Sequence, residues 1–390
     1  MKNITYLSNL RIPSEMANSV QIMKMCEAMS KAGSKVTLIK PNRLHMFGQH
    51  IDDLYDYYDI KTKFSIENLR YIDIHKLESK IPNLIYRSVN YTNKLFWERY
   101  LFNYYINNHK ESIIFMRNTL HFLLSKISKY NIPSIIEFHN LPPQRYISEY
   151  VKLFKHSSKV IPLALTKGLA EDLSEKLNIN ISDILVVPGA VDISKYENTK
   201  PSIKHNDKQI KITYVGSLIK NRGVNVLLQS AKYLPNFEFN VIGGVDSDLN
   251  YAQNYLNDNV ITNVNLLGHK PQNLIYEYYQ EADILVLPMS GKEQHTQRYA
   301  SPNKLFEYMA SAKPIIASNL PSVKEVLVNH ENCILFDPDN VDDLVDKIQF
   351  LSSSKELMSK IAENAKKDAQ NYTWDKRVEK IYNHVENFIK

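Results

Sequence analysis

Apolar residues follow two alternating patterns along the chain. Short runs rich in β-branched residues are typical of buried strands, and they alternate with segments whose apolar residues recur every three or four positions, as on one face of a helix. In the first half the strand-like runs are 3–9, 35–40, 134–140 and 184–192, and the helix-like segments are 18–31 and 117–130. This alternation predicts a mostly parallel sheet covered by helices.

The alternation restarts after a polar stretch at 198–209. The later strand-like runs are 210–218, 238–244, 264–269, 282–289, 314–318 and 333–337, and the helix-like segments are 223–233, 247–257, 271–281, 303–311 and 321–328. We therefore expect an α/β fold with two Rossmann-like doubly wound domains facing across a cleft. Ligands in such sheets bind outside the carboxyl ends of the strands.

The expected domains are 1–197 and 210–370, with 198–209 as the linker. The tail, 371–390, is expected to be a helix that packs back toward the amino-terminal domain. Its apolar residues recur at helical spacing along one face, and they are Trp374, Val378, Ile381, Val385 and Ile389.

Composition narrows the class of protein. The chain has 390 residues, of which 44% are hydrophobic and 23% charged, so it is globular. The net charge of +6 comes from 48 basic and 42 acidic residues, a mixture too even to indicate nucleic-acid binding. The only cysteines, Cys26 and Cys333, lie far apart in the sequence, which argues against a disulfide framework or a zinc site.

The sequence predicts a cytoplasmic protein. Its first residues lack the basic and apolar pattern of a signal peptide, and no apolar run approaches the roughly 18–20 residues that cross a bilayer. Only ten glycines are present. Because glycine-rich loops are scarce, a phosphate site in this chain would use helix ends and cationic side chains.

The stretch "SPNKLFEYMASAKPIIAS" (301–318) predicts a helix that leads into a buried strand. Ser301 is a suitable N-cap and Pro302 a suitable first helical residue. Lys304 and Glu307, three residues apart on one face, could pair with each other. Alternatively, Lys304 and the helix N-terminus hold a diphosphate, and Glu307, roughly 5–6 Å further along the helix, accepts both ribose hydroxyls.

A second candidate anion site lies in 214–230, where a strand ends at Gly216 and a loop with Lys220 and Arg222 leads to a helix near Gly223. The loop cations could equally be ordinary solvated side chains. The triplets Asp246-Ser247-Asp248 and Asp337-Pro338-Asp339 are interpreted as turn and capping residues, so neither a metal nor another cofactor is implied.

Several motifs together resemble a GT-B-fold glycosyltransferase of the large retaining GT4 family, the glycosyl transferases group 1. They are "YVGSL…NRG", "VIGG", "LPM", "YTW" and the 301–318 stretch, with "MRN", "EFHN" and "VVPGAVD" in the first half. The resemblance spans essentially the whole chain, and 301–318 is its most specific part. It implies that a nucleotide-sugar donor binds in the second domain.

The resemblance also implies site residues. Arg222 and Lys304 would hold the diphosphate, Glu307 the ribose, and His139 the transferred sugar, and these four are the predicted catalytic residues. Taken alone, His139 is more often a structural residue; with the resemblance, Glu137 is expected to orient its surroundings. The predicted donor-binding residues are Gly216, Ser217, Arg222, Gly243, Gly268, His269, Ser301, Pro302, Asn303, Lys304, Leu305 and Glu307.

The chain departs from the family pattern in three places. Tyr299 stands where many members have a second glutamate, "ASPNK" replaces the Gly-rich segment that follows, and the loop at 8–19 lacks the usual glycine pair. That loop is expected to shape the acceptor site. The predicted acceptor-binding residues are Arg11, Glu15, Asn18 and Arg117, and Arg117 could instead form a surface salt bridge.

Residues 80–110 interleave cations with aromatic residues, a pattern that suits docking on an anionic lipid leaflet. A buried helix pair with one solvated face is the alternative. Membrane contact here would place the protein on the inner face of the cytoplasmic membrane.

The predicted function is metal-independent transfer of a sugar, with retention of configuration, from a UDP- or GDP-sugar to a glycan or lipid-linked acceptor. The expected setting is bacterial surface polysaccharide assembly, without a nucleic-acid partner. Two alternatives keep the fold: a nucleotide-sugar epimerase, and a non-catalytic partner subunit of a polysaccharide assembly complex.

Overall fold

A computed structural model describes residues 2–14, 16–43, 51–74, 78, 80–201, 209–219 and 223–388. The chain forms two compact units. The amino-terminal unit comprises Met1–Leu165, Leu169–Val187 and Arg377–Lys390, and the carboxyl-terminal unit comprises Thr166–Gly168 and Pro188–Lys376. The boundary therefore lies near Pro188, before the polar stretch at 198–209.

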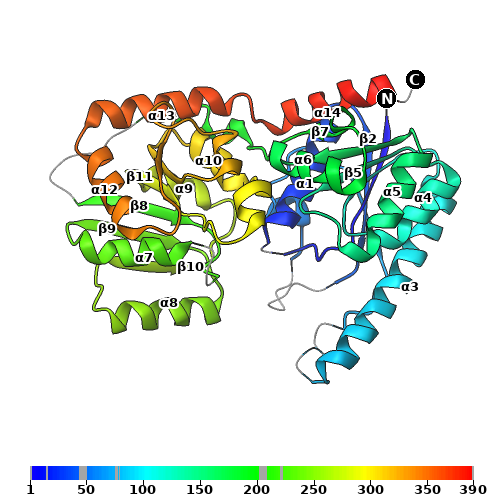
Figure 1. The fold of residues 1–390 in the computed structure, drawn as a ribbon, viewed down its shortest axis with the longest axis horizontal. Coiled ribbons are helices and arrows are strands. Elements are labelled where there is room, and N and C mark those ends of the chain that lie inside the picture. The colour runs from blue at the N-terminus through cyan, green and yellow to red at the C-terminus, as the bar shows by residue number, and fades with distance from the viewer. Residues whose placement is uncertain are drawn as a thin grey trace. The chain divides into compact units, whose positions relative to one another are not determined.

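The amino-terminal unit is built on a parallel sheet with strand order β3-β2-β1-β4-β5-β6-β7 (Figure 1). The strands are β1 (Asn3–Leu7), β2 (Lys35–Pro41), β3 (Ser65–Leu69), β4 (Ile113–Arg117), β5 (Ser134–Phe138), β6 (Val160–Ala164) and β7 (Leu185–Val186). The helices in this part of the chain are α1 (Ala17–Lys31), α2 (Leu54–Tyr57), α3 (Asn83–His109), α4 (Leu124–Tyr130), α5 (Ile147–His156) and α6 (Lys167–Leu177).

The carboxyl-terminal unit has a second parallel sheet, with strand order β10-β9-β8-β11-β12-β13. Its strands are β8 (Ile210–Val215), β9 (Phe237–Ile242), β10 (Val264–Gly268), β11 (Ile284–Leu287), β12 (Ile315–Ser318) and β13 (Ile334–Phe336). The later helices are α7 (Val224–Tyr233), α8 (Asp246–Asp258), α9 (Ile275–Glu281), α10 (Asn303–Ala310), α11 (Pro321–Lys324), α12 (Val341–Ser352), α13 (Lys355–Ala369) and α14 (Trp374–Phe388). The predicted doubly wound architecture is confirmed in both units.

Alternate residues of β11 belong to different hydrophobic clusters. Ile284 and Val286 pack in one cluster, and Leu285 and Leu287 pack in the other. Successive side chains of a strand point to opposite faces of its sheet. The second sheet is therefore covered on both faces at β11, which explains why this strand is a continuous apolar run rather than an alternating one.

Some local predictions were too long or missed a strand. The strand expected at 184–192 is limited to Leu185–Val186, with a separate bridge between Val191 and Thr373, and the helix expected at 321–328 is limited to Pro321–Lys324. Strands β3 and β6 were not predicted. The edge strand β3 has only one buried residue among its five, Leu69, so its sequence carries little of the apolar signal of a strand.

The last helix, α14, is tied to the amino-terminal unit by side-chain contacts. Tyr382 hydrogen-bonds Ser34 at 2.6 Å, and Glu386 lies 3.1 Å from the Lys2 ammonium. Within the described part of the chain, no helix combines the length and hydropathy needed to cross a membrane.

We expect Ile381→Ala to destabilise the amino-terminal unit by about 2–5 kcal/mol, because a fully buried aliphatic side chain is replaced by a cavity. Urea unfolding measures the change. The matched control is Lys380→Ala, one position earlier on the exposed face of α14. Equal unfolding midpoints for the two variants would show that α14 contributes little packing energy.

Candidate active site

The order in which successive strands join the second sheet reverses at β8. Strands β9 and β10 lie on one side of β8, and β11, β12 and β13 lie on the other. The segment after β8 runs to Gly223, whose φ of +103° suits glycine and whose missing side chain would overlap the Pro288 carbonyl just beyond β11. The carboxyl ends of β8 and β11 therefore form the switch point at which open sheets bind ligands.

Bare backbone lines this end of the sheet. The Gly216 N–H donates to the Ile242 carbonyl at 2.9 Å, and the Gly243 N–H donates to the Gly268 carbonyl at 2.8 Å. A side chain on Gly243 would overlap the Gly216 carbonyl oxygen, so these strand ends pack too closely for a larger residue. The predicted donor residues Ser217 and His269, next to these glycines, are exposed.

Lys304, in the first turn of α10, reaches the same strand ends. Its Nζ lies 3.3 Å from the Tyr214 hydroxyl and 4.4 Å from the centre of that ring. A side chain on Gly216 would meet this ammonium group. A half-buried cation is thus held beside half-buried glycine backbone, an arrangement suited to phosphate.

The start predicted at residue 303 is confirmed, but the capping roles predicted for Ser301 and Pro302 were wrong. Helix α10 begins at Asn303, with Pro302 in the N-cap position and no side-chain cap. The Ser301 hydroxyl accepts instead from the Gly189 N–H at 2.9 Å, a residue 112 positions earlier. The Pro302 carbonyl accepts from the buried Leu305 N–H at 3.0 Å.

Glu307, one turn further along α10, is half-buried and does not pair with Lys304. One carboxylate oxygen accepts from the Tyr279 hydroxyl at 2.7 Å, and the other accepts from the Gln272 amide at 3.0 Å. Burial raises the pKa of Glu307, and the Tyr279 hydrogen bond and the nearby Lys195 oppose that rise. Tyr299, at the position of the second family glutamate, is buried and presents its ring edge to His295.

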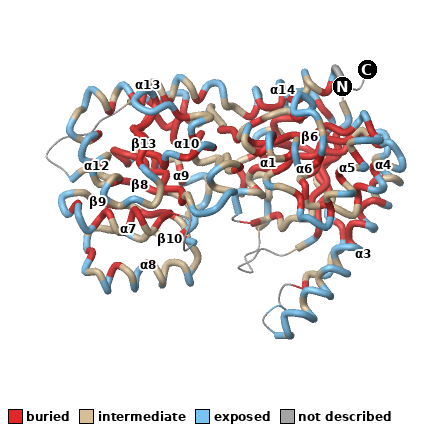
Figure 2. Tube along the Cα trace, in the orientation of Figure 1, coloured by how far each residue is buried: buried red, intermediate tan, exposed pale blue. Residues whose placement is uncertain are grey.

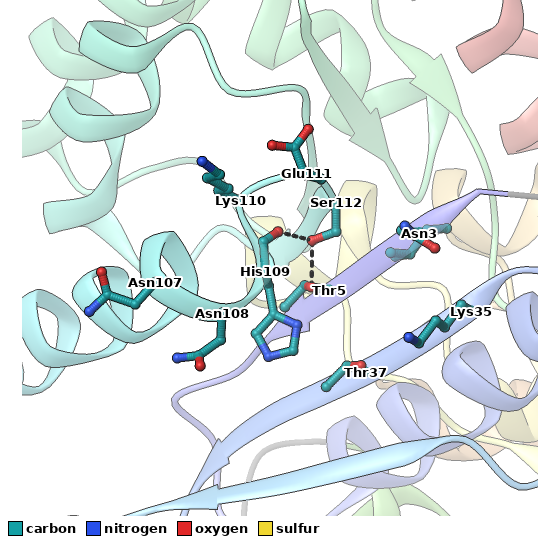
Figure 3. Close-up of a pocket in the computed structure, with 11 residues that line it drawn as sticks. Asn3, Thr5, Lys35, Thr37, Asn107, Asn108, His109, Lys110, Glu111 and Ser112 are labelled. Atoms are coloured by element: carbon teal, nitrogen blue, oxygen red, sulfur yellow. Dashed lines mark hydrogen bonds between the residues drawn. The ribbon is translucent and has the colours of Figure 1, made fainter.

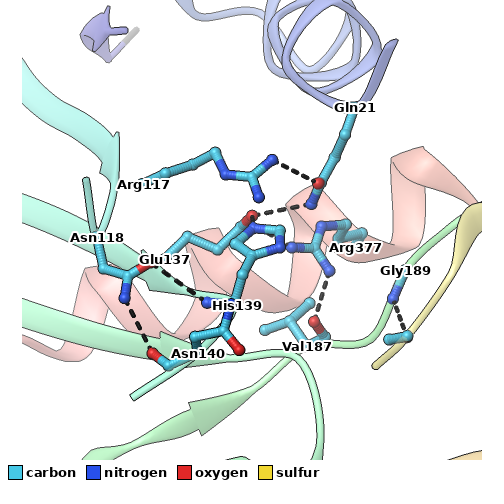
Figure 4. A network of polar contacts seen from close by, with 10 residues as sticks. Gln21, Arg117, Asn118, Glu137, His139, Asn140, Val187, Gly189 and Arg377 are labelled. Carbon is cyan, nitrogen blue, oxygen red and sulfur yellow. Dashed lines mark hydrogen bonds and ion pairs between the residues drawn. The ribbon is translucent and has the colours of Figure 1, made fainter. Parts of the chain in front are cut away.

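In the amino-terminal unit, a carboxylate at the end of β5 collects donors from three elements (Figure 4). Glu137 lies 2.5 Å from His139 Nε2, 2.9 Å from the Gln21 amide and 2.5 Å from an Arg377 nitrogen. Gln21 comes from α1 and Arg377 from α14. Arg377 also donates to the Val187 carbonyl at 2.6 Å.

The charges in this network fix the protonation states. Burial alone would raise the pKa of Glu137, but the Arg377 guanidinium and the His139 hydrogen bond hold that pKa well below its usual range. Burial, reinforced by the charge of Arg117, lowers the pKa of His139 to about 4. Since a carboxylate only accepts, the neutral His139 donates from Nε2 and keeps Nδ1 as an acceptor.

Arg117 lies at the edge of this network. It donates to the side-chain amide oxygen of Gln21 at 3.3 Å. Its buried Nε has no hydrogen-bond partner among the described residues. Burial lowers the pKa of Arg117. An unsatisfied buried donor is costly, and this nitrogen is a hydrogen-bonding group that the described fold leaves unused.

The other predicted acceptor residues do not join Arg117. Arg11 forms an ion pair with Asp73 at 3.0 Å, and Asp73 also forms an ion pair with Arg43. Asn18 lies in the first turn of α1 and is half-buried. Glu15, with the predicted donor residue Arg222, lies outside the described residues.

Sequence reasoning missed Gln21 and Arg377. The available signal for Arg377 was its position, because it lies three residues after Trp374 and four before Ile381, on the apolar face of the tail helix. A cation on an apolar helix face requires a buried partner. Gln21 carried no comparable signal, since its role depends on the fold.

A surface hollow of about 240 Å³ lies at the amino ends of the strands of the first sheet, between the start of β1 and β2 and the end of α3 (Figure 3). It contains none of the predicted site residues. The Thr5 and Ser112 hydroxyls hydrogen-bond each other at 2.6 Å, and Ser112 also donates to the His109 carbonyl. The Thr5, Ser112 and His109 side chains of the hollow already have partners, and the hollow lies at the amino ends of the strands, where parallel sheets seldom bind ligands.

Residues 195–368 match the family described as "Glycosyl transferases group 1". The match contains the Gly216, Lys304 and Glu307 region of the carboxyl-terminal unit. This segment is therefore similar to the glycosyl transferases group 1.

Curated relatives are glycosyltransferases too. An uncharacterized glycosyltransferase of Methanocaldococcus jannaschii is 25% identical over 271 residues, which is 66% of this chain and 70% of the relative. The capsular polysaccharide biosynthesis glycosyltransferase CapM of Staphylococcus aureus is 25% identical over 44% of this chain and 45% of its own length. Together with the domain, these relatives support glycosyltransferase activity.

Solved structures confirm the fold over the whole chain. The crystal structure of Anabaena HepE in complex with UDP aligns with a TM-score of 0.70, covering 99% of this chain and 100% of HepE at 12% identity. The glycosyltransferase domain therefore belongs to a chain with the GT-B fold.

We expect His139 to make stability pH-dependent. In the unfolded chain this imidazole takes up its proton with the ordinary pKa of 6.5. In the folded chain the pKa of His139 is lowered to about 4. The contribution of His139 to the free energy of unfolding is therefore complete above pH 6.5 and is lost as the pH falls toward 4. The loss is about 2 kcal/mol at pH 5.

Urea unfolding at pH 7.5 and pH 5 tests this. His139→Asn should lose less stability between the two values than the unsubstituted chain, and His156→Asn, at an exposed position of the same unit, should lose as much as the unsubstituted chain. Parallel pH profiles for all three would contradict a buried neutral imidazole.

Proposed function

We propose that the chain transfers a sugar from a nucleoside-diphosphate sugar to a glycan or lipid-linked acceptor, with retention of configuration and without a metal, as a member of the GT4 family. The observation that carries the proposal is the pair of Lys304 and Glu307 on α10, one turn apart at the sheet's switch point. Lys304 lies beside the Gly216 backbone, and Glu307 keeps unused acceptor capacity.

Glu307 has the right capacity for a ribose. A carboxylate offers about four acceptor positions. Tyr279 and Gln272 use one on each oxygen, so each oxygen can accept one further hydroxyl. The two internal hydrogen bonds also fix the orientation of the carboxylate before the nucleotide binds, which lowers the cost of ordering it.

The diphosphate would lie against Gly216 and the Lys304 ammonium, with Arg222 as a second cation. As the bond from the sugar C1 to the diphosphate oxygen breaks, negative charge grows on the leaving group, and fixed cations stabilise it. The acceptor oxygen bonds to C1 on the face that the leaving group vacates, and its proton passes to a diphosphate oxygen. The protein supplies no nucleophile in this scheme.

The amino-terminal unit would contribute recognition. The role proposed for His139 is to accept a hydrogen bond at Nδ1 from a hydroxyl of the transferred sugar, because Glu137 already occupies Nε2. Arg117, whose side chain is half-buried, would bind an anionic group of the acceptor through its guanidinium. Both side chains are held in place by the Glu137 network.

The names of similar proteins support the substrate classes. CapM is named for capsular polysaccharide biosynthesis, a second relative from Erwinia amylovora for amylovoran biosynthesis, and HepE was crystallised with UDP. A uridine nucleotide is therefore the first donor to test, and a growing surface polysaccharide is the proposed setting.

We expect Glu307→Ala to weaken UDP binding roughly 10- to 100-fold, the cost of losing hydrogen bonds to a charged acceptor. Isothermal titration calorimetry with UDP gives the affinity. Glu277→Ala removes an exposed carboxylate from the neighbouring helix α9 and should leave the affinity unchanged. Equal affinities for both variants would contradict the ribose assignment.

Lys304→Met should lower turnover roughly 100- to 1,000-fold, as removal of one preorganised charge-stabilising group does. The readout is UDP released from the UDP-sugar that best stabilises the chain against heat. Donor affinity should fall much less than turnover. The control is Lys324→Met, at an exposed position of the same unit. If the Lys304 variant turned over as fast as this control, Lys304 would not stabilise the charge of the leaving group.

A further inference from the structure

One side of α3 carries two cations with an aromatic ring between them. Arg87, Tyr91 and Lys94 are spaced by four and three residues, which places them on one face of the helix. All three are exposed, and the surface of α3 is exposed or half-buried as far as Phe96 (Figure 2). Neither Arg87 nor Lys94 has an ion-pair partner among the described residues.

This side of α3 faces the loops that follow β4 and β5. Glu98, four residues after Lys94 on the same face, accepts from the Phe122 N–H at 2.9 Å. The Tyr91 and Phe122 rings form a T-shaped contact with their centres 5.4 Å apart. Arg145, from the loop after β5, lies over Tyr91, with its guanidinium carbon 5.6 Å from the ring centre. The helix and both loops therefore meet at Tyr91.

Arg145 rests on a second aromatic ring as well. Its guanidinium carbon lies 4.8 Å from the centre of the Tyr146 ring, and one of its donors goes to the Tyr146 hydroxyl. No carboxylate among the described residues pairs with it. A guanidinium that stacks on aromatic faces keeps N–H groups in its plane for an acceptor with two oxygens. We call Arg87, Tyr91, Lys94 and Arg145 the Tyr91 cluster.

The acids near the Tyr91 cluster do not balance its charge. Glu98 is buried, and burial raises its pKa to about 8, so this carboxyl is mostly neutral at pH 7. Glu149 is half-buried in the first turn of α5. Glu78 hydrogen-bonds with Tyr86, which lies about 100° around the helix from Arg87. The three cations of the cluster therefore outnumber the charged acids around them.

The Tyr91 cluster lies at the same end of the first sheet as the Glu137 network. Its two loops begin where β4 ends at Arg117 and where β5 carries Glu137. The Asn118 side chain donates to the Asn140 carbonyl at 2.9 Å, which ties the two loops together (Figure 4). The carboxyl ends of parallel strands are where such sheets bind ligands. The cluster therefore extends the region proposed for the acceptor.

We infer that the Tyr91 cluster binds carboxylated sugar units, so that the acceptor is an acidic glycan. The planar donors of Arg145 match the two oxygens of a carboxylate. The Tyr91 ring, 44% exposed, offers an apolar surface to the C–H face of a sugar.

The spacing of the cations favours an extended ligand. Arg87 and Lys94 are seven residues, or about 10 Å, apart along α3, which suits charges repeated along a chain rather than one compact anion. The inference rests on the proposed function only for calling this glycan the acceptor. The binding itself is measured without a donor.

The test is isothermal titration calorimetry of the full-length chain with two hexasaccharides. One alternates glucuronate with N-acetylglucosamine, and the other is the neutral chain of N-acetylglucosamine. We expect the acidic hexasaccharide to bind roughly tenfold more tightly or better than the neutral one. Its affinity should fall in about 0.5 M salt, because exposed charges are screened.

Variants of the cluster should weaken binding of the acidic hexasaccharide by different amounts. Arg145→Gln should lower the affinity roughly 10- to 100-fold, the cost of losing hydrogen bonds to a charged acceptor. Arg87→Gln with Lys94→Gln should lower it roughly 3- to 10-fold, because exposed charges act through solvent. Tyr91→Ala should lower it roughly 2- to 5-fold, since Arg145 loses a ring beneath it, whereas Tyr91→Phe keeps the ring and the affinity.

Two matched controls should keep the affinity of the unsubstituted chain. Arg99→Gln removes an exposed arginine from another side of α3, and Lys126→Gln with Lys129→Gln removes two exposed cations from α4. All variants should keep their melting temperature and their affinity for UDP, which is assigned to the other unit. A chain that bound no UDP but still distinguished the two hexasaccharides would contradict the proposed donor and support this site.

Three results would overturn the inference. The two hexasaccharides could bind equally or not at all, or the cluster variants could bind the acidic one as tightly as the controls do. Alternatively, an oligothymidylate could bind as tightly as the acidic hexasaccharide and lose as much affinity in Arg145→Gln, which would show a general surface for polyanions rather than a sugar site.

Discussion

A carboxylate buried at the end of a central strand requires a partner of opposite charge, and Arg377 supplies it to Glu137. The two residues are 240 positions apart in the sequence, so this ion pair joins an early strand to the last helix of the chain. Breaking a buried pair by removing one partner costs about 3–5 kcal/mol, because the remaining charge stays uncompensated. The position of α14 and the orientation of His139 both depend on this contact.

The two proposed binding regions prepare for their ligands in different ways. The Glu137 network is closed, since its carboxylate already has three partners and His139 keeps a single acceptor nitrogen. The α10 region is open, with free acceptor capacity on Glu307 and bare backbone at Gly216. The chain has ten glycines in all, and Gly216, Gly223, Gly243 and Gly268 lie at this one edge of the second sheet. Glycine is thus concentrated where a phosphate would approach the backbone.

Local patterns in the sequence predicted what local forces determine. Strand β11 is a continuous apolar run, and Glu137 and His139 are two residues apart, so both features could be expected from the sequence. The sequence could not show that Ser301 fails to cap α10. A tertiary contact with Gly189 uses the hydroxyl that a cap would need. The Arg377 partnership is also tertiary, and no short stretch of sequence shows which buried acid a lone cation will meet.

Helices α3 and α14 show why an apolar stripe alone does not indicate what covers it. Both have the period of an amphipathic helix, yet the α14 residues Val378 and Ile381 are fully buried whereas Ile85 and Phe96 of α3 are exposed. The charges distinguish the two helices. In α14 the cation on the apolar face is neutralised inside the protein by Glu137. In α3 the acid Glu98 is buried and accepts from the Phe122 N–H at 2.9 Å, and burial raises its pKa to about 8. The same apolar period therefore corresponds to burial along α14 and to exposure along the first turns of α3.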